Sequence, residues 1–418
     1  MSALVETGDV VEVLARYPDN AFDAVLCDPP YGLSFMGKRW DYDVPSVDLW
    51  REVLRVCKPG APLLAAFGTR TYHRGVVRIE DAGWDIRDSI VWMYGSGFPK
   101  SLDVSKALDA AAGAEREVTG VAGRTGGGRA CMNDAPGNGR AKDYLAGEFY
   151  STAPATDAAR EWSGYGTALK PAHEPYVLAR KPLDGTVAAN VARWGVGALA
   201  IDACRVEGPP SVGGKSGDGL GYGGADGTRV IDRSMTDGRW PANVILDEGA
   251  GALLDAQTGA RRSAGNYPSD ATGRDGATSL RPTQGKLYAD SGGASRFFYC
   301  AKASRAERDA GCEDLSPSTG GEATGREDDS AGTRSPRAGA GRTGGARNVH
   351  PTVKPLALCE YLARLILPPR PGAILVPFAG SGSEMIGALR AGWPSVVGIE
   401  REPLYVRIAE MRLAKAAA

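Results

Sequence analysis

Short apolar runs alternate with amphipathic segments over the first hundred residues of the chain. Strands are expected at residues 22–28, 62–67 and 86–94, and helices at 47–56 and 72–82. The clearest helix places Val47, Trp50 and Leu54 at helical spacing and ends at Lys58-Pro59-Gly60. This β-α-β-α-β order predicts an α/β fold built on a doubly wound, Rossmann-like sheet.

The same alternation returns near the C-terminus. A helix is expected at 354–367, a strand at 373–376, a tight turn at 380–382, a helix at 383–391, a strand at 396–400 and a helix from 403 onward. The two halves of one sheet are therefore expected to flank a long, loop-rich insertion.

The middle of the chain is rich in glycine and interrupts this alternation. Roughly half of the 57 glycines fall in 205–345, where apolar and aromatic runs at 240–246 and 296–302 predict islands of order. The expected parts are a catalytic half at 1–183 with a loop insertion at about 99–166, a target-recognition region at 184–347 and a cofactor-binding half at 348–418.

Composition narrows the function classes only slightly. The net charge of −1 means that a nucleic-acid partner would need a local basic face. Seven scattered cysteines with no Cys-x-x-Cys pair, and three histidines, predict neither a disulfide framework nor a metal site. No apolar run approaches the ~18 residues of a membrane span and no signal core begins the chain, so a cytoplasmic protein with no membrane partner is expected.

The first chemical motif is Asp28-Pro29-Pro30-Tyr31, placed after the first expected strand. An exocyclic amino group of a base is a poor nucleophile because its lone pair is delocalised into the ring. The Asp28 carboxylate and the proline-fixed Pro29 carbonyl can accept its two hydrogens, and Tyr31 offers a ring for an extruded base. The alternative is a proline-stiffened turn, and such a string arises by chance in roughly one chain of this size in several hundred.

The second motif is a glycine loop at residues 377–383 (PFAGSGS), between an expected strand and helix. Glycines allow the backbone to approach a ligand closely, and Glu400 at the end of the next strand is placed to bind ribose hydroxyls. Met385 occupies the third glycine position of Gly-x-Gly-x-x-Gly, and no phosphate-binding Gly-Lys-Ser/Thr follows. The loop alone does not separate S-adenosylmethionine from NAD.

Together the two motifs resemble the DNA amino-methyltransferases (N6-adenine or N4-cytosine) of the permuted, beta-type order. In that order the catalytic motif precedes the cofactor motif, with target recognition between them. The resemblance includes 350–355 (HPTVKP) and 170–175 (KPAHEP) and covers roughly residues 5–183 and 348–414. It implies S-adenosylmethionine as cofactor, double-stranded DNA as partner and N6 of adenine as target, because Asp rather than Ser begins the motif.

The resemblance also assigns site residues. The catalytic residues would be Asp28, Pro29, Pro30 and Tyr31, and the cofactor would be bound by Thr352, Lys354, Phe378, Gly380, Ser381, Gly382, Ser383 and Glu400. In one departure, the family usually has Asp at the position of Val376, where a carboxylate would face the cationic end of the cofactor. Either Glu384 compensates in part, or the site is degenerate.

Several alternatives remain open. The target could be N4 of cytosine, or the chain could be an RNA or protein amide methyltransferase, although those motifs usually begin with Asn. A NAD-dependent oxidoreductase would leave the first motif idle, and a catalytically silent DNA-binding relative would explain Val376. A homodimer and a partner restriction nuclease, as in restriction-modification, are compatible with the resemblance and not indicated by it.

Other residues carry weaker signals. Cys27 is expected to be a small core residue, because C5-cytosine chemistry uses a Pro-Cys dipeptide that this chain lacks. His73 either touches substrate or lies on a surface helix. One mixed aromatic and basic set is either a nucleic-acid surface or core packing of the aromatic rings with a solvated basic face; its members are Arg296, Phe297, Phe298, Tyr299, Lys302, Arg305 and Arg308. A second set lies near the expected target pocket and is given no role; its members are Trp92, Tyr94, Phe98 and Lys100.

Overall fold

A computed structural model of the chain describes residues 1–33, 41–95, 97, 101–124, 148–208, 211–212, 235–236, 238–262, 290–301, 306–317 and 347–417. The chain divides into two compact units, each described here by itself. The first comprises Met1–Gly95, Glu174–Glu307 and Val353–Ala418, and the second comprises Ser96–His173 and Arg308–Thr352.

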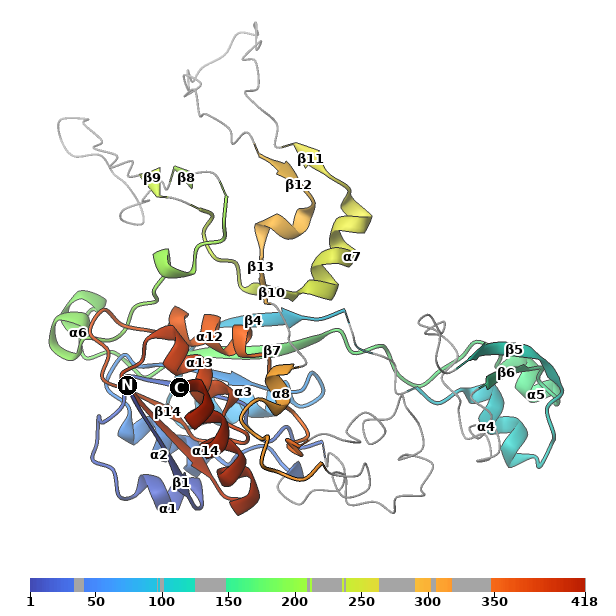
Figure 1. Cartoon of the computed structure of the whole chain (residues 1–418), viewed down its shortest axis with the longest axis horizontal. Helices are drawn as coiled ribbons and strands as arrows, with labels where there is room; N and C mark the ends of the chain where they lie inside the picture. The colour runs from blue at the N-terminus through green and yellow to red at the C-terminus, as the bar shows by residue number, and fades with distance from the viewer. Residues whose placement is uncertain are drawn as a thin grey trace, which may run out of the picture. The chain divides into compact units, whose positions relative to one another are not determined.

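A nine-stranded sheet runs through the first unit in the order β1-β15-β14-β2-β3-β7-β4-β10-β13 (Figure 1). Its strands are β1 Ser2–Thr7, β2 Ala24–Cys27, β3 Pro62–Ala66, β4 Asp85–Met93, β7 His173–Arg180, β10 Val244–Asp247, β13 Tyr299–Ala301, β14 Ala373–Val376 and β15 Ser395–Glu400. The pairs β1–β15, β15–β14, β14–β2, β2–β3, β4–β10 and β10–β13 are parallel, and β3–β7 is antiparallel. The expected α/β fold with a doubly wound sheet is confirmed.

Helices cover both faces of this sheet (Figure 1). One face packs against α12 Leu356–Leu365, α13 Ser383–Ala391 and α14 Pro403–Ala417, and the other against α1 Val10–Leu14, α2 Val47–Val56 and α3 Tyr72–Asp81. The sequence accounts for the start and the buried face of α2. The Ser46 side chain accepts a hydrogen bond from the Leu49 N–H at the start of the helix, and Trp50 is fully buried. Central strands β2 and β3 are buried on both faces, which fits their continuous apolar sequences.

The sheet changes winding direction between β14 and β2. From β14 the chain moves outward to β15, and from β2 it moves the other way to β3. Residues Ile374 and Leu375 pair in parallel with Ala24 and Val25, so the carboxyl ends of both strands meet at one edge. Such a switch point is where open α/β sheets bind ligands.

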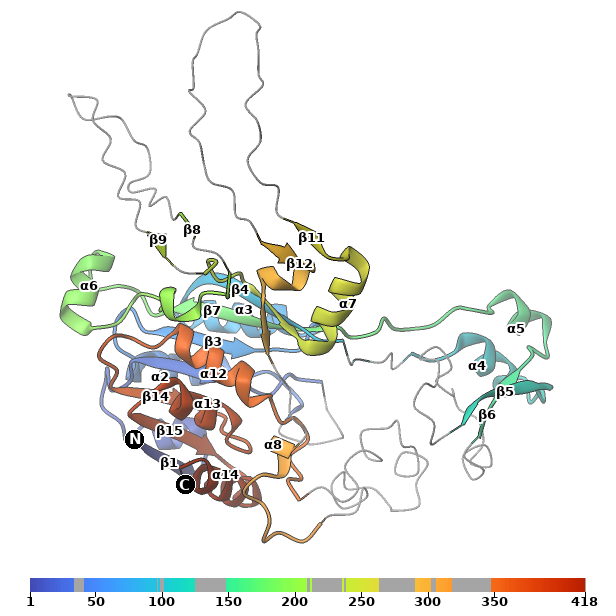
Figure 2. The same cartoon turned by 45° about the horizontal axis from the view of Figure 1, so that its top comes forward.

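The glycine-rich middle contributes directly to the sheet. The two runs expected as islands of order contain β10 and β13, which extend the sheet beyond β4. The remaining elements of this part are α6 Val187–Trp194, η4 Asp202–Cys204, β8 Ser211–Val212, β9 Met235–Thr236, α7 Glu248–Thr258, β11 Arg261–Arg262, β12 Ser291–Gly292 and η5 Ala294–Phe297 (Figure 2). No helix in the described part of the chain is long and apolar enough to cross a membrane.

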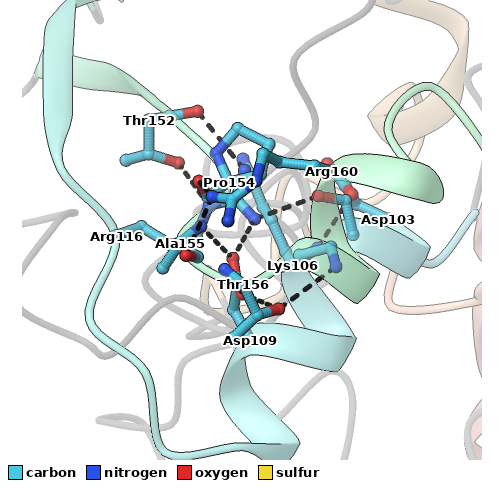
Figure 3. Close-up of polar contacts among 11 residues, drawn as sticks. Asp103, Lys106, Asp109, Arg116, Thr152, Pro154, Ala155, Thr156 and Arg160 are labelled. Atoms are coloured by element: carbon cyan, nitrogen blue, oxygen red, sulfur yellow. Dashed lines mark hydrogen bonds and ion pairs between the residues drawn. The ribbon is translucent and has the colours of Figure 1, made fainter.

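The second unit contains a small module built around one buried carboxylate. Its elements are α4 Val104–Ala111, β5 Val118–Arg124, β6 Glu148–Thr152 and α5 Asp157–Glu161, and α8 Ala306–Asp309 spans the boundary with the first unit. The Asp109 carboxylate accepts the backbone N–H groups of Ala155 and Thr156, at 3.0 and 2.9 Å, and the Thr156 hydroxyl at 2.8 Å (Figure 3). The Arg116 guanidinium lies 2.6 Å from the same carboxylate. Asp109 therefore ties α4 to the segment that enters α5.

The pKa of Asp109 shows that the ionised form holds this module. Burial opposes ionisation, but the bonds from Ala155, Thr156 and Arg116 outweigh it and lower the pKa to about 2. Because the folded-state pKa lies below the ordinary one, the stabilisation is present above about pH 4 and is lost as the pH falls toward 2.

We expect Asp109→Asn to open this module locally. The amide would replace a charged acceptor by a neutral one and leave Arg116 without its ion-pair partner. Hydrogen exchange at pH 7 should become at least about tenfold faster at the Ala155 and Thr156 amides. Asp157→Asn, at a fully exposed position of α5, is the matched control and should leave both rates unchanged. Unchanged exchange in Asp109→Asn would show that the module does not depend on this carboxylate.

Candidate functional site

The two motifs found in the sequence lie at the switch point of the sheet. Asp28 follows β2 directly, and the glycine loop at residues 377–383 follows β14, its neighbour in the sheet. Pro29 is buried, whereas Asp28, Pro30 and Tyr31 are partly exposed. The structure thus brings the expected catalytic residues and most of the expected cofactor residues to one edge.

A single ammonium group joins the catalytic motif to the later parts of the chain. Lys354 Nζ lies 2.6 Å from Asp28 Oδ2, 3.1 Å from Glu174 Oε2 and 3.1 Å from the Tyr31 hydroxyl. The Tyr31 hydroxyl also lies 2.7 Å from Asp28 Oδ1 and 3.2 Å from Glu174 Oε2. The Lys354 side chain is 6% exposed, so these contacts form largely out of water.

Electrostatics keep Lys354 charged and Tyr31 protonated. Burial alone would lower the pKa of Lys354, but Asp28 and Glu174 outweigh it and raise that pKa well above its ordinary value. Burial, followed by the charges of the same two carboxylates, raises the pKa of Tyr31 well above its ordinary value. Lys354 was expected to line the cofactor; in the structure its ammonium contacts the catalytic motif.

Asp41 fixes the backbone that follows the motif. This carboxylate is 2% exposed and accepts the N–H groups of Tyr31, Gly32 and Leu33 at 2.7, 2.9 and 3.2 Å. On the other side, a Cβ on Gly68 would lie 3.0 Å from the Tyr31 ring, so only glycine leaves that ring its present place. Tyr31 is therefore held by its backbone, by its hydroxyl and by a neighbouring chain segment.

The glycine loop turns sharply and is anchored by Glu400. Gly382 has φ +80°, and a Cβ there would lie 3.2 Å from Ala409 of α14. The Gly380 N–H donates to Glu400 Oε2 and the Glu402 N–H to Glu400 Oε1, both at 2.8 Å. Burial raises the pKa of Glu400 while these backbone donors oppose the rise. With the Arg401 N–H as a third donor, the carboxylate still keeps an acceptor site for a ligand hydroxyl.

A buried arginine holds the serines of the same loop. Arg412 on α14 is 1% exposed, and its guanidinium lies 2.9 Å from the Ser381 hydroxyl and 3.1 Å from the Ser383 hydroxyl. Both serines were expected to bind cofactor. In the structure their hydroxyls are already hydrogen-bonded to Arg412.

The remaining expected cofactor residues lie in different surroundings. Phe378 is partly buried with its ring 6.3 Å from that of Trp50. Thr352 belongs to the second unit, where its N–H donates to His350 Nδ1 at 3.4 Å. Val376 is fully buried in the apolar core at the end of β14, whereas Glu384 lies in the first turn of α13 and is 7% exposed.

The weaker sequence signals divide between core and surface. Cys27 is fully buried, as expected of a small core residue, and burial raises the pKa of its thiol well above the ordinary value, which favours the neutral thiol. His73 is exposed on α3. Tyr94 follows β4, and burial together with Glu174 raises its pKa to about 12. Phe98, Lys100, Lys302 and Arg305 lie outside the described residues.

The aromatic and basic set at residues 296–308 is also divided between the core and the surface. The Tyr299 ring stacks on that of Tyr361 at 4.0 Å within the core, as the packing alternative predicted. Phe297 is 42% exposed, with the guanidinium groups of Arg239 and Arg296 over its ring at 5.0 and 4.3 Å. Among the described members of the set, Phe297 and Arg296 present an aromatic and basic surface.

Sequence reasoning missed three residues that shape the site. Asp41, Glu174 and Arg412 act by holding Tyr31, Lys354 and the glycine loop. Glu174 could have been found, because it lies within the 170–175 motif on which the resemblance partly rests. Asp41 and Arg412 carry no local signal, because their partners are defined only once the chain is folded.

We expect Lys354→Met to destabilise the protein in a pH-dependent way. Without the ammonium, the Asp28 and Glu174 carboxylates would lie close together in a mostly buried site, so the folded-state pKa of at least one would rise. Stability is then lost as the pH rises through that pKa. Urea unfolding should show a loss of about 3–5 kcal/mol at pH 8 and a smaller loss at pH 5. Lys415→Met, exposed on α14, should cost nothing at either pH; equal losses of the Lys354 variant at both pH values would contradict this account.

Comparison with known proteins gives partial matches. No protein-family model matches the chain. The chain is 30% identical over 98 residues to YubD of Escherichia coli (strain K12), described as a methylase, and the matched segment is 22% of this chain and 43% of that protein.

The chain also aligns with solved structures of DNA methylases. TTHA0409 of Thermus thermophilus, described as a DNA modification methylase, matches with a TM-score of 0.38 and 14% identity, covering 99% of this chain and 96% of that one. M1.HpyAVI in complex with SAM matches with a TM-score of 0.36 and 12% identity (99% and 100% covered), and the cytosine-N4-specific PvuII methyltransferase with 0.41 and 13% (99% and 86%). TM-scores below 0.5 do not establish a common fold, so the fold described above rests on the chain's own strand order.

Proposed function

We propose that the chain is an S-adenosylmethionine-dependent DNA methyltransferase acting on an exocyclic amino nitrogen, N6 of adenine. One observation carries the proposal. The Asp28-Pro29-Pro30-Tyr31 motif and the glycine loop, far apart in sequence, follow adjacent strands at the switch point of the sheet. A site for an amino group and a loop for a nucleoside cofactor are thereby adjacent.

The residues around the glycine loop fit an adenosine-containing cofactor. Glu400 ends β15 beside the loop, and its carboxylate oxygens can accept hydrogen bonds from ribose hydroxyls. The left-handed turn at Gly382 lets the backbone pass close to a ligand, and Phe378 offers a partly exposed ring. When bound, S-adenosylmethionine would supply a methyl group already activated by its positive sulfonium.

The catalytic motif would then act by positioning. The Asp28 carboxylate would accept one hydrogen of the target amino group, and the Pro29 carbonyl the other. With its hydrogens held, the nitrogen lone pair would point toward the methyl group. The N–C bond would form as the methyl–sulfur bond breaks, with no covalent enzyme intermediate; the sulfur would leave as a neutral thioether, and the methylated nitrogen would lose one proton to solvent by way of the Asp28 carboxylate. Lys354 and Tyr31 keep the Asp28 carboxylate in one orientation and would leave each of its oxygens a free lone pair.

The choice of DNA as substrate rests on the resemblance of the two motifs to DNA amino-methyltransferases and on the partial matches to known methylases. Asp at the start of the motif favours adenine, and N4 of cytosine is the second candidate because the same two acceptors suit its amino group. Double-stranded DNA would enter with the target base extruded from the helix. The exposed Phe297 ring, with the guanidinium groups of Arg239 and Arg296 over it and both paired with Asp290, is one surface in the recognition region with chemistry suited to nucleic acid.

Methylation of genomic DNA tests the proposal directly. The purified protein would be incubated with unmethylated genomic DNA and methyl-labelled S-adenosylmethionine, and the nucleosides analysed by mass spectrometry. We expect labelled N6-methyldeoxyadenosine; labelled N4-methyldeoxycytidine instead would keep the mechanism and change the base. Absence of both, on DNA from several sources and with cofactor binding confirmed by calorimetry, would refute a DNA methyltransferase.

We expect Asp28→Ala to lower the transfer rate by at least about 100-fold, because one of the two acceptors is removed where charge develops. Its affinity for S-adenosylmethionine should stay within about tenfold of the wild type, since Asp28 acts on the base. Asp48→Ala, exposed on α2, is the control and should retain full activity. Loss of cofactor binding equal to the loss of activity would contradict the role given to Asp28.

A further inference from the structure

Glu384 is a buried carboxylate that no side chain among the described residues bonds or pairs with. It is the second residue of α13, directly after the glycine loop, and is 7% exposed. Apart from its own backbone N–H, no described residue forms a hydrogen bond or ion pair with it. A buried carboxylate in this state is costly unless a cation reaches it.

The charges around Glu384 leave an excess of negative charge. Asp28 after β2 and Glu174 on β7 share the Lys354 ammonium, and Arg412 on α14 is hydrogen-bonded to the serines of the glycine loop. Among the described residues, three carboxylates thus lie near two cations, and the other titratable groups that interact with Glu384, Cys27 and Cys359, are buried thiols. S-adenosylmethionine carries a sulfonium, an ammonium and a carboxylate, so its net charge of +1 matches this excess.

The pKa of Glu384 shows that its ionised form is disfavoured in the free protein. Burial, and next the charge of Asp28, raise its pKa to about 7, while Lys354 and Arg412 oppose the rise. Because the folded-state pKa lies above the ordinary one, the free protein loses stability as the pH rises through this range. A bound cation would reverse the shift and favour the ionised form.

We propose that Glu384 replaces the acid missing at Val376 and faces the sulfonium of S-adenosylmethionine. The inference rests on the proposed function. The sulfonium, rather than the ammonium, is assigned because the transferable methyl must point at Asp28, and Glu384 directly follows the glycine loop, which lies beside Asp28 at the edge of the sheet. Glu384 thereby favours the cationic methyl donor over S-adenosylhomocysteine, whose thioether is neutral.

Calorimetric binding of both ligands to the full chain tests this role. Glu384→Gln keeps the shape of the side chain and removes its charge. At pH 8 we expect its affinity for S-adenosylmethionine to fall about tenfold and its affinity for S-adenosylhomocysteine to fall less than about twofold. The free variant should also melt at a higher temperature than the wild type at pH 8, because an unpaired buried charge is gone.

The pH dependence gives a second readout. With a pKa of about 7, the ionised fraction of Glu384 in the free protein falls about tenfold between pH 8 and pH 6, so wild-type affinity should fall about tenfold in excess of that of Glu384→Gln. Titration of the ligand's own amino group is common to both proteins and cancels. Glu410→Gln, exposed on α14, should behave as wild type throughout.

The outcomes separate the two proposals. A wild-type protein that does not bind S-adenosylmethionine at millimolar concentration would overturn the proposed function. A wild type that binds, with Glu384→Gln binding equally well and with the same pH dependence, would overturn the role of Glu384 alone. Equal loss of affinity for both ligands would overturn the assignment to the sulfonium.

Discussion

The parallel pairing of β14 with β2 is the constraint on which the site depends. It brings segments from opposite ends of the chain into one register: the Gly372 N–H donates to the Asp23 carboxylate, 349 residues away. Because parallel strands end at the same edge, this pairing alone makes the glycine loop a neighbour of Asp28. Everything proposed about chemistry follows from that adjacency, and neither motif would form a site on its own.

Charged side chains are buried around the ends of β14 and β2. One ammonium, on Lys354, orients two carboxylates and a phenol, and one guanidinium, on Arg412, fixes the glycine loop. Such pairs contribute little net stability once the cost of removing them from water is counted. Their value lies in holding Asp28 and the loop in single orientations before a substrate arrives.

Much of this arrangement could be predicted from sequence, because the informative signals are local. The bounds expected for α2, β14 and α13 agree with the structure, since each has an apolar pattern closed by proline or glycine. The first strand, β1, and helix α1 were missed: β1 is mostly exposed and is defined by its partner β15 rather than by its own pattern. The partners of Lys354 were missed for the same reason, because an ion pair between residues 326 positions apart in the chain leaves no local pattern in the sequence.

The long-range pairing also sets an order of events during synthesis. On the ribosome, β2 emerges early, yet one of its two neighbours in the sheet is β14, made about 350 residues later. At about 5–20 residues per second, an apolar strand edge would wait for roughly 17–70 s before it is covered. A nascent chain with such an edge can pair with other chains. Production of this protein should therefore depend on how well the cell shields an incomplete sheet, and slower translation would lengthen that exposure.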